Sequence, residues 1–399
     1  MTAGESHGPA LLATIEGLPS GLRITTDDLR RVLARRRLGY GRGARQEFEA
    51  DEVSILAGVR HGVTTGAPVS IRIGNSEWPK WETVMSADPV DPSALLIDAG
   101  TGDEREIARN RPLTRPRPGH ADLPGMLSYD LPEARPVLER ASARETAARV
   151  ALGALAEALL EQVAGVRLVS HVIAVGTQRT NSEVVPTPAD ENALCEASMR
   201  TLDTADNARF EAAVDEAKHA GDTIGGVVEV IAYGVPVGLG THVTARERLD
   251  ARLAAALMSI QSVKGVEIGD GFAQAALLGS AAHDEIVRGA DGHLTRTTNH
   301  AGGIEGGTSN GAPIVARAGF KPISTVPRAL RSVDLATGEE AVGLHQRSDT
   351  CQVVPGAVIA EAEVALVLAD ALFDHAGGRS VSEMRRNLSS YLEVVGERA

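Results

Sequence analysis

Arginine fills five of the eleven positions at residues 35–45, which read RRRLGYGRGAR. Three glycines, Gly39, Gly41 and Gly43, interrupt the arginines, and glycine lets a backbone turn tightly and approach a ligand closely. The planar guanidinium group suits carboxylates and phosphates. The stretch therefore predicts a site for a small polyanion. Its spacing alone also fits a series of charged side chains that face solvent or an interface. If Arg35 faces solvent, it should contribute much less than Arg42.

Ser6 and His7 lie among glycines in the stretch AGESHG at residues 3–8. The stretch matches G-x-S-x-G, the pattern around the nucleophile of serine hydrolases, but that pattern needs a full strand before the serine, and only five residues precede Ser6. His7 could instead be an exposed general acid, and a lone histidine is also often structural. The sequence leaves these alternatives open.

Two further stretches combine arginine with acid or base side chains. Residues 113–125, LTRPRPGHADLPG, hold Arg117, His120 and Asp122 on a segment that three prolines make rigid. Residues 345–351, HQRSDTC, place an arginine two positions before an aspartate. A catalytic or binding role is one interpretation of each stretch, and an ordinary turn or a salt-bridged loop is the other.

A glycine-rich segment at residues 299–311, NHAGGIEGGTSNG, is followed by KPISTVPR at residues 321–328. Successive backbone N–H groups in such a segment can bind a phosphate, and Lys321, Ser324 and Thr325 would add donors. The P-loop and dinucleotide-binding patterns do not occur in the sequence. Glycine richness by itself also fits simple turns.

The composition is that of a globular enzyme rather than a nucleic-acid-binding protein. The 399 residues carry a formal net charge of −13, with 43% hydrophobic and 3% aromatic residues. Broad nucleic-acid binding normally needs a basic face. We find no apolar run of about 20 residues and no signal-peptide pattern, so we expect no membrane partner and a cytoplasmic location. Cys195 and Cys351 lack metal-site spacing, and we expect no metal.

Hydrophobic periodicity predicts strands within residues 52–74 and 223–240 and helices at 135–163, 246–265 and 360–378. Gly265 is expected to end the second helix. The helices are rich in alanine and apolar nearly all round, which indicates burial on both sides. The elements do not alternate regularly as strand and helix, so we predict one α+β domain over residues 1–399. We expect a loop insertion at 98–112 and another loop at 177–192.

Eight motifs follow one another along the chain: GESHG, RRRLGYGRGAR, RPRPGHAD, RASARETA, GVEIGDGF, GGIEGGTSNG, KPISTVPR and HQRSD. In this order they closely resemble the chorismate synthase family, and the resemblance extends over essentially the whole chain. It implies an enzyme that converts 5-enolpyruvylshikimate 3-phosphate into chorismate by 1,4-anti elimination of phosphate, the last step of the shikimate pathway. It also implies a requirement for reduced FMN.

The resemblance implies a β-α-β sandwich, with helices between mainly antiparallel sheets, and a homotetramer. Because no nucleotide-binding fingerprint supports reduction of the flavin by NADPH on the enzyme, we expect an external supply of reduced FMN. The runner-up activity is a serine hydrolase that uses Ser6.

Matched motif by motif, the resemblance implies that His7 protonates the departing phosphate, His120 stabilises the anionic reduced flavin, and Asp349 relays the proton removed from the substrate. The residues implied to bind the substrate are Ser6, Arg36, Arg42, Arg45, Arg117 and Arg347. The residues implied to bind the flavin are Arg140, Ala141, Ser142, Gln261, Ser262, Gly306, Lys321, Pro322, Ile323, Ser324, Thr325 and Arg347.

Overall fold

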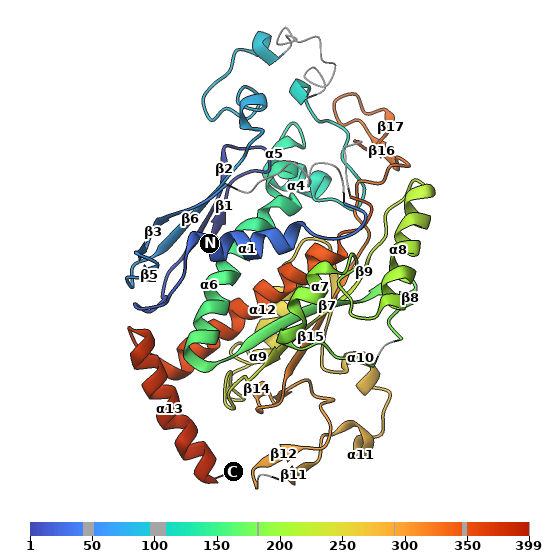
Figure 1. The fold of residues 1–399 in the computed structure, drawn as a ribbon. Coiled ribbons are helices and arrows are strands. Elements are labelled where there is room, and N and C mark those ends of the chain that lie inside the picture. The colour runs from blue at the N-terminus through green and yellow to red at the C-terminus, as the bar shows by residue number, and fades with distance from the viewer. Residues whose placement is uncertain (43–51, 96–108, 182, 291, 345–348, 399) are drawn as a thin grey trace.

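The structure is a computed structural model that describes residues 1–42, 52–95, 109–181, 183–290, 292–344 and 349–398. Two antiparallel sheets enclose a layer of helices (Figure 1). This arrangement confirms the predicted α+β class and the β-α-β sandwich. Most of the loop predicted at 98–112 lies outside the described residues.

The first sheet has four strands in the order β1-β2-β6-β3. Their bounds are Thr2–Ala3 for β1, Ala10–Ile15 for β2, Val53–Ala57 for β3 and Val69–Gly74 for β6. Along β6, Val69, Ile71 and Ile73 are completely buried, whereas the residues between them are partly exposed. This period of two is what the sequence predicts for a sheet with one buried face.

The second sheet has five strands in the order β10-β15-β9-β7-β8. Their bounds are Arg167–Val175 for β7, Gln178–Arg179 for β8, Gly226–Tyr233 for β9, Val263–Ile268 for β10 and Ile314–Phe320 for β15. Val228, Val230 and Ala232 of β9 pair with Ala318, Ala316 and Ile314 of β15. Small side chains on this face leave room for a closely packed helix.

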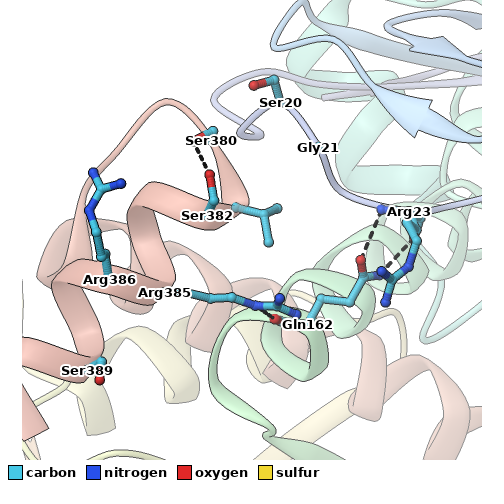
Figure 2. Close-up of a pocket in the computed structure, with 10 residues that line it drawn as sticks. Ser20, Gly21, Arg23, Gln162, Ser380, Ser382, Arg385, Arg386 and Ser389 are labelled. Carbon is cyan, nitrogen blue, oxygen red and sulfur yellow. Dashed lines mark hydrogen bonds between the residues drawn. The ribbon is translucent and has the colours of Figure 1, made fainter.

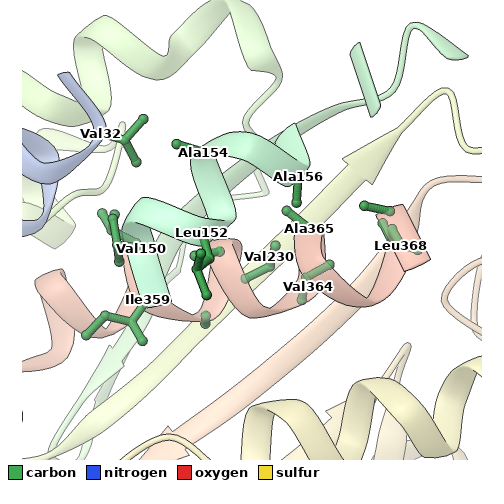
Figure 3. Close-up of a cluster of buried hydrophobic side chains, with 14 of the residues drawn as sticks. Val32, Val150, Leu152, Ala154, Ala156, Val230, Ile359, Val364, Ala365 and Leu368 are labelled. Carbon is green, nitrogen blue, oxygen red and sulfur yellow. The ribbon is translucent and has the colours of Figure 1, made fainter. Parts of the chain in front are cut away.

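Two long helices, α6 (Thr146–Ala164) and α12 (Val353–Ala376), form the layer between the sheets. A Cβ on Gly153 of α6 would lie only 2.4 Å from Cβ of Ala362 on α12, so the two backbones approach as closely as glycine permits. Leu152, Ile359 and Leu368 belong to the cluster of buried hydrophobic side chains that includes both helices (Figure 3). The prediction of helices buried on both sides is therefore confirmed for these two helices. It is wrong for the helix predicted at 246–265, because that helix, α9 (Leu249–Met258), buries only Leu249, Leu253 and Leu257 and exposes its other face.

The bounds of all three predicted helices differ from the structure: α12 begins at Val353 instead of residue 360, and α9 spans only Leu249–Met258 of the predicted 246–265. The helix predicted over 135–163 is interrupted: α5 ends at Arg140, and a single 3₁₀ turn, Ala143–Glu145, precedes α6. The hydroxyl of Ser142 accepts a hydrogen bond from the backbone N–H of Arg144 and so favours a new helix start. Gly265 lies inside β10 instead of ending a helix, because pairing with β15 outweighs its turn preference.

The other elements surround this sandwich. The remaining α-helices of the described residues are α1 (Thr26–Arg37), α4 (Asp122–Tyr129), α5 (Arg135–Arg140), α7 (Glu191–Glu196), α8 (Thr204–His219), α9 (Leu249–Met258), α10 (Gly271–Gln274), α11 (Gly279–Ala282) and α13 (Val381–Arg398). Two-stranded hairpins are β4–β5 (Val59–Arg60, Val63–Thr64), β11–β12 (Ile286–Arg288, Leu294–Arg296), β13–β14 (Ile304–Glu305, Thr308–Ser309) and β16–β17 (Arg331–Val333, Glu340–Val342). Among the described helices, none combines the length and apolarity that crossing a bilayer requires.

Candidate active site

The loop between β1 and β2 places Ser6 and His7 against the end of α5. The backbone N–H of Ser6 donates to the carbonyl of Glu139 at 3.0 Å, and the hydroxyl of Ser142 donates to Ser6 Oγ at 3.1 Å. Gly4 makes the turn possible: its φ is +102°, and a Cβ there would lie 2.5 Å from the carbonyl oxygen of Ala10. The loop is thus fixed from both sides.

His7 is held by a buried carboxylate and an aromatic ring. Its Nδ1 lies 2.9 Å from both carboxylate oxygens of Glu139, and its backbone N–H donates to Glu139 Oε2 at 2.8 Å. The side chain of Glu139 has no exposed surface. The imidazole stacks on Trp81, with ring centroids 3.7 Å apart and an angle of 18° between the planes. Such contacts fix both the orientation and the tautomer of a histidine.

Arg36 is buried at the C-terminal turn of α1 and contacts the segment that starts α6. Its Nε donates to the hydroxyl of Thr146 and its Nη2 to the carbonyl of Ala143, each at 3.0 Å. Only 7% of Arg36 is exposed. This buried cation therefore contacts the residue that follows Ser142, whose hydroxyl is bonded to Ser6.

Arg42 pairs with Asp349 through a hydrogen bond of 2.5 Å from its Nη1. The glycine-containing turn before it packs tightly on α12: Gly39 has a φ of +119°, and a Cβ there would lie 2.7 Å from Cβ of Val354. The glycines thus allow the close approach that the sequence predicts, although their neighbour is the protein itself. The two remaining arginines predicted for the site, Arg45 and Arg347, lie outside the described residues.

A second cluster forms around His120. Its Nδ1 lies 2.5 Å from Oδ1 of the fully buried Asp122, whose other carboxylate oxygen accepts from Arg117 Nε at 2.9 Å. Burial opposes ionisation of Asp122, but hydrogen bonds from His120 and Arg117 outweigh it and hold the pKa of that carboxyl well below its usual range. Arg117 also donates to the hydroxyl of Thr325 at 2.9 Å. These hydrogen bonds hold the cluster together around one buried carboxylate.

Residues 321–325 join the second cluster to the first. Lys321 donates through its ammonium group to the carbonyl of Gly119, and its backbone N–H donates to the carbonyl of Ser262 at 2.9 Å. The adjacent Gln261 donates to Glu145 at 3.0 Å, directly beside the start of α6. The predicted residues of both clusters therefore belong to one continuous network.

The chain is similar to known proteins over its whole length. The family model for chorismate synthase matches residues 1–373. The chain belongs to the chorismate synthase family. It is 62% identical over 398 residues to the chorismate synthase of Beutenbergia cavernae, covering 100% of this chain and 98% of that relative. The chorismate synthase of Streptomyces avermitilis is 60% identical over 393 residues, covering 98% of this chain and 97% of the relative.

A crystal structure of chorismate synthase matches the fold with a TM-score of 0.76 at 33% sequence identity, covering 100% of this chain and 98% of that chain. The resemblance inferred from the motifs is therefore confirmed, together with the enzyme class. The serine hydrolase alternative is set aside, because the hydroxyl of Ser6 is bonded to Ser142 while Nδ1 of His7 is bonded to Glu139. A member of the chorismate synthase family has no need of that serine as a nucleophile.

Two of the residues matched to flavin-binding segments of chorismate synthases lie at the edge of the network or apart from it. Arg140 is partly exposed and donates to the carbonyls of Thr2 and Gly4. Gly306 lies in the exposed turn between β13 and β14, beside the start of α9, whereas Gln261 follows the end of that ten-residue helix. A helix of this length spans about 15 Å, so within one chain Gly306 is remote from Gln261.

Glu139 and Trp81 are the two residues of this site that sequence reasoning missed. Glu139 lies within the LERASARE segment, next to residues that the motif match did identify. Trp81 is one of only two tryptophans in the chain, which was a usable signal. Arg109 and Arg135 also lie over its ring, with guanidinium carbons 5.2 and 5.9 Å from the centroid. Among the described residues, no group of three or more His, Cys, Asp or Glu side chains could hold a metal ion.

Proposed function

We propose that this chain converts 5-enolpyruvylshikimate 3-phosphate into chorismate and phosphate, with His7 as the proton donor to the leaving phosphate. In this elimination the C–O bond to the phosphate breaks, the ring loses a proton, and a ring double bond forms. The observation that carries the proposal is that His7 is fixed on the buried carboxylate of Glu139, which the buried Arg135 also approaches. Family membership supplies the reaction to which this geometry is assigned.

The carboxylate of Glu139 gives His7 the properties that a general acid needs. Because it accepts from Nδ1, it fixes the tautomer and the orientation of the imidazole, and Nε2 would then be the nitrogen that faces the substrate. Trp81 restricts rotation of the ring. His7 would then donate its Nε2 proton to the departing phosphate, which leaves more easily as a less charged group.

The arginines would bind the two carboxylates and the phosphate of the substrate. Arg36 is already oriented by Thr146 and Ala143, so little of its conformational freedom remains to be lost on binding. Arg42 is neutralised by Asp349 and would exchange part of that contact for the substrate. We assign to Asp349 the relay of the ring proton, because a carboxylate at this position can accept it.

Reduced FMN fits the residues of the second cluster. Oε1 of Gln261 is buried and, among the described residues, has no hydrogen-bond partner, so it is suited to accept from a bound ring N–H. Lys321, Ser324 and Thr325 would supply donors to the flavin, and His120 with Arg117 would supply positive charge. When bound, the reduced flavin would lend electron density transiently to a substrate whose phosphate otherwise leaves poorly.

We also propose a homotetramer in the cytoplasm, supplied with reduced FMN from outside and with no pyridine-nucleotide site. Support for assembly comes from large apolar side chains that are exposed in the segment from α10 to β11. Phe272 is 82% exposed, Leu278 is 81% exposed and Ile286 is 61% exposed. Cys195 and Cys351 are both free thiols, which agrees with a reducing compartment.

His120→Ala should change the ionisation of bound reduced FMN. A nearby positive charge favours the anionic flavin, so its removal should raise the N1 pKa and alter the spectrum of the ternary complex. Anaerobic spectra across pH measure this independently of rate. His300→Ala is a matched control, because His300 also pairs with an aspartate at 2.5 Å but lies outside the network. If His7→Ala shifts the flavin titration and His120→Ala does not, the two roles are exchanged.

Arg42→Ala should weaken substrate binding by about 2–4 kcal/mol, the range for truncating one partner of a close charge pair. The measurement is calorimetric titration with substrate in the absence of flavin, so that no turnover occurs. Arg30→Ala is the control, because Arg30 is an exposed arginine that pairs with Asp27 on the preceding helix. Equal and small losses of substrate affinity in both variants would indicate that the arginines of residues 35–45 do not form a binding site.

A further inference from the structure

A cavity of about 570 Å³ lies at the opposite end of the helical layer from His7. It is open to solvent and is bordered by the start of α13, the loop between β2 and α1, and the end of α6 (Figure 2). Its lining is polar apart from one glycine and one valine: Ser20, Gly21, Arg23, Gln162, Ser380, Val381, Ser382, Arg385, Arg386 and Ser389. The volume is in the range of small-molecule sites.

The charge of this lining is opposite to that of the whole chain. Arg23, Arg385 and Arg386 contribute three positive charges and no acidic residue lines the cavity, whereas the chain has a net charge of −13. The nearby Glu383 is engaged elsewhere, because its carboxylate accepts from the backbone N–H of Arg379 at 2.7 Å. The cavity therefore concentrates positive potential in an otherwise acidic protein.

Hydrogen bonds across the floor of the cavity hold its parts together. The side chain of Gln162 accepts from the backbone N–H of Arg23 at 3.0 Å and donates to its carbonyl at 2.8 Å. Arg385 donates through Nε to the backbone carbonyl of Gln162 at 2.5 Å, which leaves its two terminal nitrogens available. Within the described part of the chain, none of the three lining arginines forms an ion pair. Three guanidinium groups are thus left without counter-charge around one fixed cavity.

We propose that this cavity binds a small anion that carries phosphate or several carboxylates. Three guanidinium groups match the oxygens of such a ligand, because guanidinium is the side chain best suited to them. The site is distinct from the candidate active site, because the 19 residues of α6 separate the two by about 28 Å. Arg385, Arg386 and Ser389 also lie beyond residue 373, where the match to the family model ends.

Equilibrium dialysis with radiolabelled pyrophosphate at constant ionic strength tests the proposal. Arg23→Gln and Arg386→Gln each remove one positive charge without breaking a side-chain contact that we observe. Arg385 is not replaced, because its side chain donates to the backbone carbonyl of Gln162 in α6. Arg331→Gln, at a position whose side chain is 88% exposed on a remote hairpin, is the control for charge alone. Thermal unfolding of all four proteins shows that the variants fold.

We expect the wild type and Arg331→Gln to bind pyrophosphate equally, and both cavity variants to bind it at least tenfold more weakly at one site per chain. None of the three substitutions lies in the candidate active site. Pyrophosphate bound there is therefore the same in all four proteins and does not change the difference in binding between wild type and the cavity variants. Equal binding by all four proteins would overturn the proposal. An equal loss in Arg331→Gln would also overturn it, because the effect would then be one of net charge.

Discussion

Replacement of His7 by alanine should lower turnover by about 10²–10⁴-fold, the usual contribution of a general acid, while FMN and substrate still bind. Binding survives because the arginines of the network are untouched. The fold should survive as well, since Glu139 keeps its hydrogen bond from the backbone N–H of residue 7 and stays within 4.0 Å of Arg135. A single-turnover assay under anaerobic conditions, combined with substrate titration, separates the rate from the affinity.

Glu139→Gln is an informative companion to this variant. It keeps the shape of the side chain but replaces the carboxylate that accepts from His7 Nδ1 with an amide, so it should loosen the orientation of the imidazole and produce a smaller loss of turnover than His7→Ala. A His7→Ala variant that keeps turnover within tenfold of wild type would show that another group donates the proton.

Replacement of Arg35 by alanine should destabilise the fold by about 3–5 kcal/mol, the loss expected when one partner of a buried ion pair is removed. Arg35 does not face solvent, so the condition under which it was expected to contribute less than Arg42 to substrate binding is not met. Its guanidinium pairs at 2.6 Å with both Glu361 and Glu191, in a cluster that Arg200 completes. Burial opposes the charge of Arg35, but these carboxylates outweigh it and raise the pKa of the guanidinium.

Urea unfolding at one protein concentration measures this loss. Arg30→Ala is the matched control on the same helix, because Arg30 is exposed and such surface pairs contribute about 1 kcal/mol or less. Arg35→Lys should lose less than Arg35→Ala, since it retains a positive charge beside Glu361. Similar small losses for Arg35→Ala and Arg30→Ala would mean that the buried cluster does not stabilise the fold.

The contrast between Arg35 and Arg36 shows what the sequence could predict and what it could not. The run of arginines and glycines correctly indicated a special segment, and periodicity correctly indicated helices buried between sheets. The sequence did not distinguish which arginine faces the site, because neighbouring residues on a helix point about 100° apart and the partners come from distant segments. Arg35 meets Glu361, which is 326 residues away, whereas Arg36 meets Thr146.

The same limit explains the partners of His7. A histidine between glycines was recognisable as a candidate acid, but Glu139 is 132 residues away and occupies a short helix that the periodicity merged with α6. The break at Ser142 depends on a local hydrogen bond and on the Ser6 contact, neither of which leaves a signal in hydrophobic spacing. Motif order could therefore identify the family and many candidate residues, whereas only the fold shows how they support one another.

The most direct test of the proposed function is an anaerobic assay with 5-enolpyruvylshikimate 3-phosphate and chemically reduced FMN, performed with and without NADPH. We expect chorismate and phosphate to form in equal amounts over many turnovers, at the same rate whether or not NADPH is present, and no turnover when flavin is omitted. A folded protein that releases no chorismate under these conditions, or that forms it equally well without flavin, would contradict the proposed function.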